Sequence, residues 1–187
     1  DFYLAISHHV AGRIEKYYHR TVEKIIYPPV DTELFTKKSN EKGMKSGPFL
    51  CVSRLVPYKR LDILVDAFNE LGWPLIIIGS GWSESALRRE ARGNITFIGD
   101  HLTDSKLALY YQKSRAFVFA GVEDLGLVAV EAQACGKPVI CYRHSGMAET
   151  VIDGVTGVLF GSQDKASIIA ALRTFDAGWY DSNSCRK

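Results

Sequence analysis

Short, continuously apolar segments recur along this chain and are separated by spacers with helical periodicity. The apolar segments span residues 49–53, 75–78, 95–98, 116–119, 138–141 and 157–160. Apolar runs of this length, without alternating polar residues, are typical of parallel strands buried on both faces. The spacer 61–71 repeats its apolar residues every three or four positions, which predicts an amphipathic helix. Because strands alternate with helices, the sequence predicts an α/β fold with a Rossmann-like, doubly wound parallel sheet.

Composition supports a folded domain and excludes several classes of protein. The 187 residues are 47% hydrophobic and 24% charged, with a net charge of +2, so the chain can bury a core and is not disordered. No apolar stretch approaches the roughly 20 residues of a membrane-spanning helix, and the basic residues form no cluster that would indicate nucleic acid. The cysteines lack a CxxC pair, which indicates buried thiols in a reducing, cytoplasmic compartment. They are Cys51, Cys135, Cys141 and Cys185.

The first 31 residues differ from the rest of the chain. They read as strand, helix and strand, and Pro28-Pro29 should end this βαβ-like unit because neither proline can donate a backbone hydrogen bond. We interpret residues 1–31 as the interdomain tail of an N-terminal domain outside this chain, and residues 32–187 as the main domain.

Two segments of the main domain are expected to lack regular structure. Residues 36–47 are polar and rich in glycine and serine, which is typical of a surface loop. The chain ends without an evident last packed element, so we expect it to be truncated at the C-terminus. Residues after Ala171 are expected to fray, because Trp179 and Tyr180 have no downstream helix to pack against.

A basic segment follows the first strand of the main domain. It carries Arg54, Lys59 and Arg60, and the next helix is expected to begin at Pro57 or Tyr58. The first turn of a helix favours acidic residues, so Lys59 and Arg60 placed there would repel its dipole unless an anion is bound. With an anion, two cations and free amides would form a phosphate site. The alternative is a solvated basic face without a ligand.

Two glycines follow the second strand. The spacing of Gly79 and Gly81 is that of the first two glycines of a dinucleotide fingerprint, and Asp100 lies where a ribose-binding acid would be sought. However, Glu84 replaces the third glycine, and the pair does not follow the first strand of the domain. A tight strand-to-helix turn is therefore the alternative that we favour from the residues alone.

Acidic residues follow the fourth strand. Glu123 and Asp124 lie in a loop, Gly126 opens a helix, and Glu131 falls about two turns into it. This helix is apolar on most of its circumference, so burial of Glu131 would be costly unless its carboxylate accepts hydrogen bonds. A pair of ligand hydroxyls would provide them, and otherwise the side chain reaches solvent, a lysine or an arginine.

The histidines give no indication of a metal site. His8 and His9 fit the start of a surface helix, and His144 fits a loop. No two histidines have the helical spacing of metal ligands and no Asp-x-Asp occurs, so phosphate charge would be balanced by arginine and lysine rather than by Mg²⁺.

The order of these motifs resembles the family 4 (group 1) glycosyltransferases of the GT-B fold. The matching motifs are Arg54…Lys59, Gly79-Ser-Gly81, Glu123-x7-Glu131 and Ser145-Gly146-x-x-Glu149. The stretch EDLGLVAVEAQACGKPVI is similar to a variant found in mannosyltransferases of polysaccharide and lipopolysaccharide assembly. This resemblance implies a retaining transferase with two Rossmann-like domains, of which this chain would be the C-terminal, donor-binding half.

The resemblance also implies roles for individual residues. Arg54 and Lys59 would hold the donor diphosphate and stabilise it as the leaving group. Glu123 would contact the donor sugar and Glu131 the ribose hydroxyls. The other donor-binding residues would be Gly79, Gly81, Leu125, Gly126 and Leu127. Departures from the family pattern are Asp124-Leu125 for Gly-Phe, Ser145-Gly146 for Gly-Gly and Pro28-Pro29 for Asn-Gly.

The implied reaction transfers a hexose from a nucleoside diphosphate sugar without a cofactor or metal. GDP-mannose is the favoured donor, with UDP- and ADP-sugars open. The acceptor would be a glycan or a lipid-linked molecule held by the N-terminal domain, and the full enzyme could associate peripherally with a membrane. We expect the isolated chain to be inactive. Two alternatives remain: a non-catalytic nucleotide-sugar-binding or interaction domain, and a dinucleotide-binding module.

Overall fold

The computed structural model describes residues 2–37, 47–99, 101–176 and 179–186, and its main domain is a six-stranded parallel sheet. The strand order is β5-β4-β3-β6-β7-β8. The strands are β3 (Phe49–Val52), β4 (Leu75–Ile78), β5 (Ile95–Ile98), β6 (Phe117–Phe119), β7 (Val139–Tyr142) and β8 (Gly157–Phe160). All six predicted strands are confirmed: β4, β5 and β8 have the predicted bounds, and the ends of the other three differ by at most one residue.

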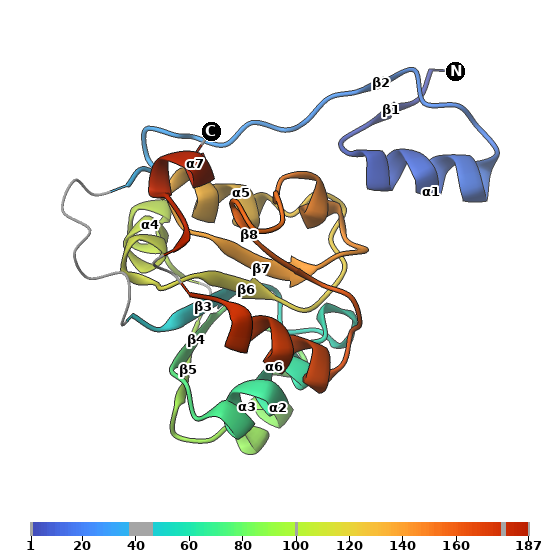
Figure 1. Cartoon of the computed structure of the whole chain (residues 1–187). Helices are drawn as coiled ribbons and strands as arrows, with labels where there is room; N and C mark the ends of the chain where they lie inside the picture. The colour runs from blue at the N-terminus through green and yellow to red at the C-terminus, as the bar shows by residue number, and fades with distance from the viewer. Residues whose placement is uncertain (1, 38–46, 100, 177–178, 187) are drawn as a thin grey trace.

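Helices cover both faces of this sheet, as Figure 1 shows. One layer contains α2 (Leu61–Leu71), α3 (Glu84–Glu90) and α6 (Lys165–Thr174), and the other contains α4 (Asp104–Lys113), α5 (Leu127–Ala134) and α7 (Ser182–Arg186). Short 3₁₀ turns, η2 (Pro57–Lys59) and η3 (Gly146–Glu149), follow β3 and β7. The predicted helix 61–71 is confirmed, and its apolar stripe, with Leu64, Val65 and Phe68 fully buried, packs on the sheet.

The strand order contains a topological switch point between β3 and β6. From β3 the chain winds outward through β4 to β5, returns to β6 on the other side of β3, and then winds outward again to β8. In open α/β sheets, ligands bind beyond the carboxyl ends of the strands at such a point. The loops after β3 and β6 are therefore the place to examine for a site.

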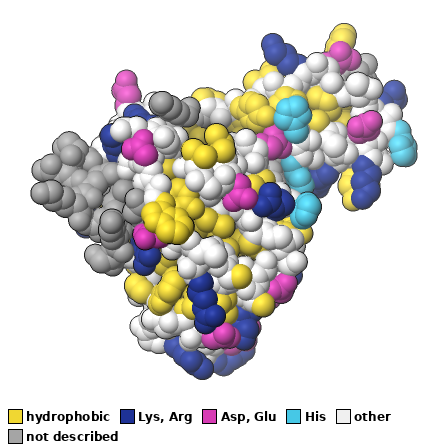
Figure 2. Space-filling model, viewed as in Figure 1, with side chains coloured by type: hydrophobic (Ala, Val, Ile, Leu, Met, Phe, Trp, Pro, Cys, Tyr) yellow, Lys and Arg dark blue, Asp and Glu magenta, His cyan; other side chains and the backbone are white. Residues whose placement is uncertain are grey.

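The N-terminal unit has the predicted βαβ order. Strands β1 (Leu4–Ala5) and β2 (Lys24–Ile25) pair in parallel, and α1 (His8–Tyr18) connects them. Regular structure stops before Pro28, as predicted from the double proline. Figure 2 shows hydrophobic side chains at the surface of this unit. The exposed ones are Phe2, Leu4, Ile6, Tyr17, Tyr18, Ile26 and Tyr27.

The expectation that the C-terminal residues fray is wrong. Helix α7 packs against α5 and buries Cys185, and the ring of Tyr180 stacks on Phe175 at a centroid distance of 5.2 Å. Arg186 donates hydrogen bonds to the carbonyl oxygens of Thr32 and Ala134, which ties the last helix to the start of the domain. Of the two aromatic residues named in the expectation, Trp179 is exposed, at 77%. The expectation failed because α7 forms after Tyr180 and its packing partners lie upstream in the sequence.

The remaining structural expectations concern the cysteines, the polar loop and the membrane. All four cysteines are buried thiols that form no disulfide, and burial raises the pKa of the Cys141 thiol to about 12. Most of the predicted loop 36–47 lies outside the described residues. Across the described part of the chain, every helix is too short or too polar to cross a lipid bilayer.

Candidate functional site

The loops after β3 and β6 meet at the switch point through an ion pair. Lys59, the last residue of η2, places its Nζ 2.5 Å from Oε1 of Glu123, in the loop after β6. The Lys59 side chain is 9% exposed and that of Glu123 is 21% exposed. The ammonium also lies 4.9 Å from the ring centroid of Tyr58 and 5.9 Å from that of Phe119. The chain thus buries a cation and an anion together at the edge where ligands of this fold bind.

The backbone of Glu123 is held by the turn after β7. Its N–H donates to Oγ of Ser145 over 3.0 Å, and its carbonyl accepts from the N–H of Gly146 over 2.8 Å. A Cβ on Gly146 would lie 2.0 Å from the Asp124 carbonyl oxygen, so this contact requires glycine. Ser145, one of the departures from the family pattern, therefore contributes a hydroxyl that positions Glu123. Sequence reasoning did not identify this contact.

Arg54 lies on the outer side of the ion pair. Its guanidinium is exposed, and its Nη2 donates to the hydroxyl of Tyr58 over 2.5 Å. Arg54, Lys59, Glu123 and Asp124 line two adjoining cavities of about 360 and 480 Å³. These volumes are within the range of small-molecule sites. Two predicted cations and a predicted carboxylate therefore share one concave surface.

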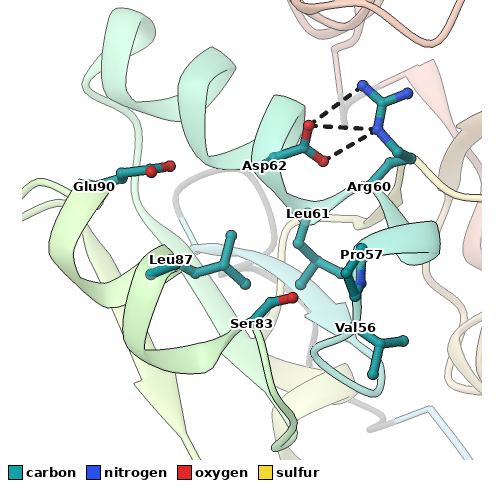
Figure 3. A pocket seen from close by; sticks show the side chains of 9 residues that line it. Val56, Pro57, Arg60, Leu61, Asp62, Ser83, Leu87 and Glu90 are labelled. Atoms are coloured by element: carbon teal, nitrogen blue, oxygen red, sulfur yellow. Dashed lines mark hydrogen bonds and ion pairs between the residues drawn. The ribbon is translucent and has the colours of Figure 1, made fainter.

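Arg60 does not belong to this site, which corrects the expectation that Lys59 and Arg60 share the first turn of a helix. The 3₁₀ turn ends at Lys59, Arg60 adopts a left-handed conformation at φ 53°, and α2 begins only at Leu61. This reversal directs Arg60 away from Lys59, and its Nε lies 3.2 Å from Oδ1 of Asp62 (Figure 3). Arg60 and Asp62 line a separate cavity of about 470 Å³ between α2 and α3.

The N-terminal end of α5 forms one wall of the 360 Å³ cavity. Leu125, Gly126 and Leu127, all predicted to bind the donor, line it. Gly126 is the N-cap residue of α5, and the first backbone N–H groups of an α-helix have no acceptor within the helix. The arrangement therefore directs polar backbone groups and a positive helix end to the same space as Arg54 and Lys59.

Glu131 is partly buried and accepts a hydrogen bond that the sequence did not reveal. The hydroxyl of Tyr111, a fully buried residue of α4, donates to its Oε2 over 2.8 Å. Burial raises the pKa of Glu131, the hydrogen bond from Tyr111 lowers it, and the charge of Asp104 raises it. The sequence offered ligand hydroxyls, or else solvent, a lysine or an arginine, as partners of the Glu131 carboxylate. The structure adds a third kind of partner, because one carboxylate oxygen accepts from a protein hydroxyl.

Gly79 and Gly81 serve the packing of two loops. Both have positive φ, at 141° and 153°, and a Cβ on them would lie 1.9 Å from the carbonyl oxygen of Ser53 and 2.4 Å from that of Leu55. The two loops are joined by the N–H of Leu55, which donates to the Ser80 carbonyl over 2.7 Å. This geometry supports the tight-turn interpretation, and donor contacts of both glycines stay predictions. Asp100 lies outside the described residues.

The histidines occupy the predicted places. His8 and His9 open α1, and the His144 ring packs against Tyr142 at 5.4 Å. Among the described residues, no three His, Cys, Asp or Glu side chains gather as metal ligands would.

The N-terminal unit contacts the loop after β6 and the 3₁₀ turn after β7. Ser7, the N-cap of α1, donates from its hydroxyl to the carbonyl of Asp124 over 2.5 Å, and Arg13 Nη1 lies 2.6 Å from Oδ1 of the same residue. The N–H groups of His8 and His9 donate to the carboxylate of Glu149 over 2.8 and 2.6 Å. Helix α1 is thereby fixed to the loop of Glu123 and to η3.

Comparison with known proteins identifies a family for this arrangement. Residues 33–185 match the family described as "Glycosyl transferases group 1". The chain is 31% identical over 164 residues to an uncharacterized glycosyltransferase of Methanocaldococcus jannaschii, covering 85% of this chain and 45% of that protein. It is 32% identical over 172 residues to the GDP-mannose-dependent alpha-(1-6)-phosphatidylinositol monomannoside mannosyltransferase of Mycolicibacterium smegmatis, covering 78% of this chain and 44% of that protein. The chain thus spans less than half the length of these relatives.

A solved structure has the same fold. HepE of Anabaena, in complex with UDP and glucose, superposes with a TM-score of 0.82 at 20% identity over 99% of this chain and 57% of that one. At this identity the likeness concerns the fold, which is that of one half of a GT-B protein.

Proposed function

The chain belongs to the group 1 glycosyltransferases, and on that premise we propose that it binds the nucleoside diphosphate sugar donor of a hexosyltransferase. The observation that carries this proposal is the meeting of Arg54, Lys59 and Glu123 around cavities at the β3–β6 switch point. No other arrangement among the described cavities joins two cations with a carboxylate at the end of the sheet where ligands of such folds bind.

Arg54 and Lys59 would stabilise the diphosphate as the leaving group. Cleavage of the anomeric C–O bond places negative charge on the departing nucleoside diphosphate, and donors fixed in advance stabilise such charge most effectively. Lys59 is fixed by burial, whereas Arg54 is exposed and can adjust to a second phosphate. Because the protein itself supplies both positive charges, we propose that transfer needs no metal ion or other cofactor.

The two glutamates suit the sugar and the ribose. Glu123 lies beside Lys59 and would accept hydrogen bonds from hydroxyls of the donor sugar. In Glu131, Tyr111 engages Oε2, which leaves Oε1 to accept from ribose hydroxyls. We propose that the sugar then passes to an acceptor hydroxyl with its anomeric configuration retained: the C–O bond to phosphate breaks, a C–O bond to the acceptor forms, and the acceptor proton leaves with the diphosphate.

GDP-mannose is the donor that we favour. The relative from Mycolicibacterium smegmatis is named as GDP-mannose-dependent, and the Glu123-Asp124-x-Gly126 sequence is the basis of the mannosyltransferase resemblance. The structure of HepE with UDP and glucose keeps UDP-sugars as the second candidate. The base therefore has to be decided by experiment.

The acceptor is expected to bind outside this chain. The chain covers less than half the length of these two relatives. We therefore propose that the rest of the complete enzyme holds a glycan or lipid-linked acceptor. We further propose that the complete enzyme is cytoplasmic and associates peripherally with a membrane. The chain alone would then bind donor without transferring sugar. A dinucleotide-binding function is disfavoured, because it gives no role to Arg54, Lys59 and Glu123, which line the same cavities.

A calorimetric titration tests donor binding directly. The 187-residue chain would be titrated with GDP, GDP-mannose, UDP, UDP-glucose and NAD at up to millimolar concentration. We expect one nucleoside diphosphate and its sugar to bind, and Arg54→Ala and Glu131→Gln to weaken that binding. Arg60→Ala is the matched control, because this neighbouring cation faces the other cavity. Binding of NAD alone, or of no nucleoside diphosphate, would contradict the proposal.

A further inference from the structure

Of the two cations in the proposed diphosphate site, the buried one, Lys59, is paired with Glu123. Glu123 holds the Lys59 ammonium at 2.5 Å, and the rings of Tyr58 and Phe119 border the same ammonium. The exposed Arg54, by contrast, is bonded to a neutral hydroxyl, that of Tyr58. A phosphate can therefore approach Arg54 freely, whereas it must compete with the Glu123 carboxylate for Lys59.

Resting on the proposed function, we infer that Glu123 is a specificity-determining residue that makes the site select the sugar-bearing donor over the free nucleoside diphosphate. Both ligands present a diphosphate to Lys59 and displace Glu123 from it. Only the donor also offers sugar hydroxyls, which can donate hydrogen bonds to the displaced carboxylate. The free nucleoside diphosphate leaves that carboxylate partly buried and without a compensating partner, which is costly.

The structure restricts how Glu123 can respond. Ser145 and Gly146 hold its backbone, and the loop of Asp124 is fixed against Gly146. Only the side chain can turn, so the displaced carboxylate stays near the phosphates, where like charges repel. After transfer, the pair can form again as the diphosphate dissociates. The same contact would therefore favour binding of the substrate and release of the product.

Inorganic pyrophosphate tests this inference without a base or a sugar. The 187-residue chain would be titrated with pyrophosphate and followed by calorimetry or amide chemical shifts. We expect Glu123→Gln, which keeps the shape but removes the charge, to bind pyrophosphate about tenfold more tightly than the wild type, as the coupling of close charge pairs suggests. Glu123→Ala should change the affinity in the same direction, and thermal unfolding of each variant would verify the fold.

A double-mutant cycle shows whether the effect passes through Lys59. In a Lys59→Met background, Glu123→Gln should raise the affinity for pyrophosphate much less than in the wild type, because competition for Lys59 is already absent and only the repulsion between carboxylate and phosphate is removed. An equal gain in both backgrounds would indicate a general loss of negative charge and overturn the inference. Unchanged or weaker binding of pyrophosphate to Glu123→Gln would overturn it as well.

The ratio of two dissociation constants completes the test. In the wild type, the donor should bind more tightly than its diphosphate, with GDP-mannose measured against GDP and UDP-glucose against UDP. Glu123→Gln should reduce this preference at least about tenfold, because it removes both the repulsion between carboxylate and free diphosphate and the ionised acceptor for sugar hydroxyls. If Glu123→Gln leaves the ratio of the two dissociation constants unchanged, the inference is refuted. If Glu131→Gln nevertheless weakens donor binding, the proposed function remains supported.

Discussion

The hydroxyl of Tyr111 donates a 2.8 Å hydrogen bond to Oε2 of Glu131 and joins α4 to α5. The Tyr111 ring has no exposed surface and packs edge-on against Phe35, at a centroid distance of 5.9 Å. Because the ring cannot move without disturbing the core, its hydroxyl fixes the rotamer of the carboxylate. This contact sets which oxygen of Glu131 is available to a ligand.

Tyr111→Phe should weaken donor binding about tenfold at pH 7, since a hydrogen bond to a charged group contributes on that order. The hydrogen bond lowers the pKa of Glu131, whereas burial and Asp104 raise it, so its loss should raise that pKa further. Affinity should therefore fall at a higher pH in the variant than in the wild type as the solution is acidified. Titrations across pH 4–8 would show this shift, and Tyr110→Phe on the same helix is the control. A loss of affinity that is independent of pH would indicate a packing defect instead.

Glu131→Gln should stabilise the fold at neutral pH while it weakens donor binding. The pKa of Glu131 is raised in the folded state, so the folded chain holds this proton more tightly than the unfolded chain does. Stability contributed by the protonated carboxyl is present at low pH and is lost as pH rises through the folded pKa. The melting temperature of the variant should exceed that of the wild type at pH 7, and the difference should shrink toward pH 4. Equal melting curves at pH 7 would contradict this expectation.

Arg54→Ala and Lys59→Ala should each reduce turnover of the complete transferase about 10²-fold or more, as the removal of a preorganised charge-stabilising group does. They should differ in stability. Lys59→Ala leaves Glu123 partly buried without its partner and should lower the melting temperature, whereas loss of the exposed Arg54 should not. Diphosphate release and calorimetry would measure both effects. Near-normal turnover in either variant would exclude its role at the leaving group.

Glu149→Ala should weaken the attachment of the N-terminal unit to the main domain. Glu149 accepts from the N–H groups of His8 and His9 at the start of α1, and from the hydroxyl of Tyr27. We expect the protection of α1 amides to fall by about 1–2 kcal/mol, since a carboxylate at a helix N-terminus contributes on that order, with the sheet unaffected. Hydrogen exchange would resolve the two regions. Arg13→Ala should have a smaller effect, because its pair with Asp124 is 56% exposed on both sides.

Gly79→Ala should destabilise the domain by about 3 kcal/mol, because it combines an unfavourable backbone conformation with a clash. The added Cβ would lie 1.9 Å from the Ser53 carbonyl oxygen, and φ is 141°. Gly93→Ala is the matched control, since a Cβ there meets nothing within 4 Å and should change stability by less than about 0.5 kcal/mol. Urea unfolding would measure both. A small effect of Gly79→Ala would show that the two loops can separate at little cost.

Local patterns were sufficient for the sheet and for most elements. Buried parallel strands need continuous apolar residues, and α2 needs an apolar stripe, so both are visible in neighbouring residues. The predicted start of α2 was wrong, because Arg60 adopts a left-handed conformation that separates the 3₁₀ turn from the helix. No sequence pattern indicates this conformation. The C-terminal expectation was wrong because α7 packs on α5, and such long-range packing leaves no periodic signal.

The sequence by itself determined the parallel α/β fold, the unit before the prolines and the candidate residues Arg54, Lys59, Glu123 and Glu131. Only the tertiary structure decided their partners: Lys59 pairs with Glu123, Ser145 holds the Glu123 backbone, and Tyr111 holds Glu131. The physical reason is distance along the chain. Hydrophobic periodicity acts between near neighbours, whereas each of these contacts joins residues that only the order of strands in the sheet brings together.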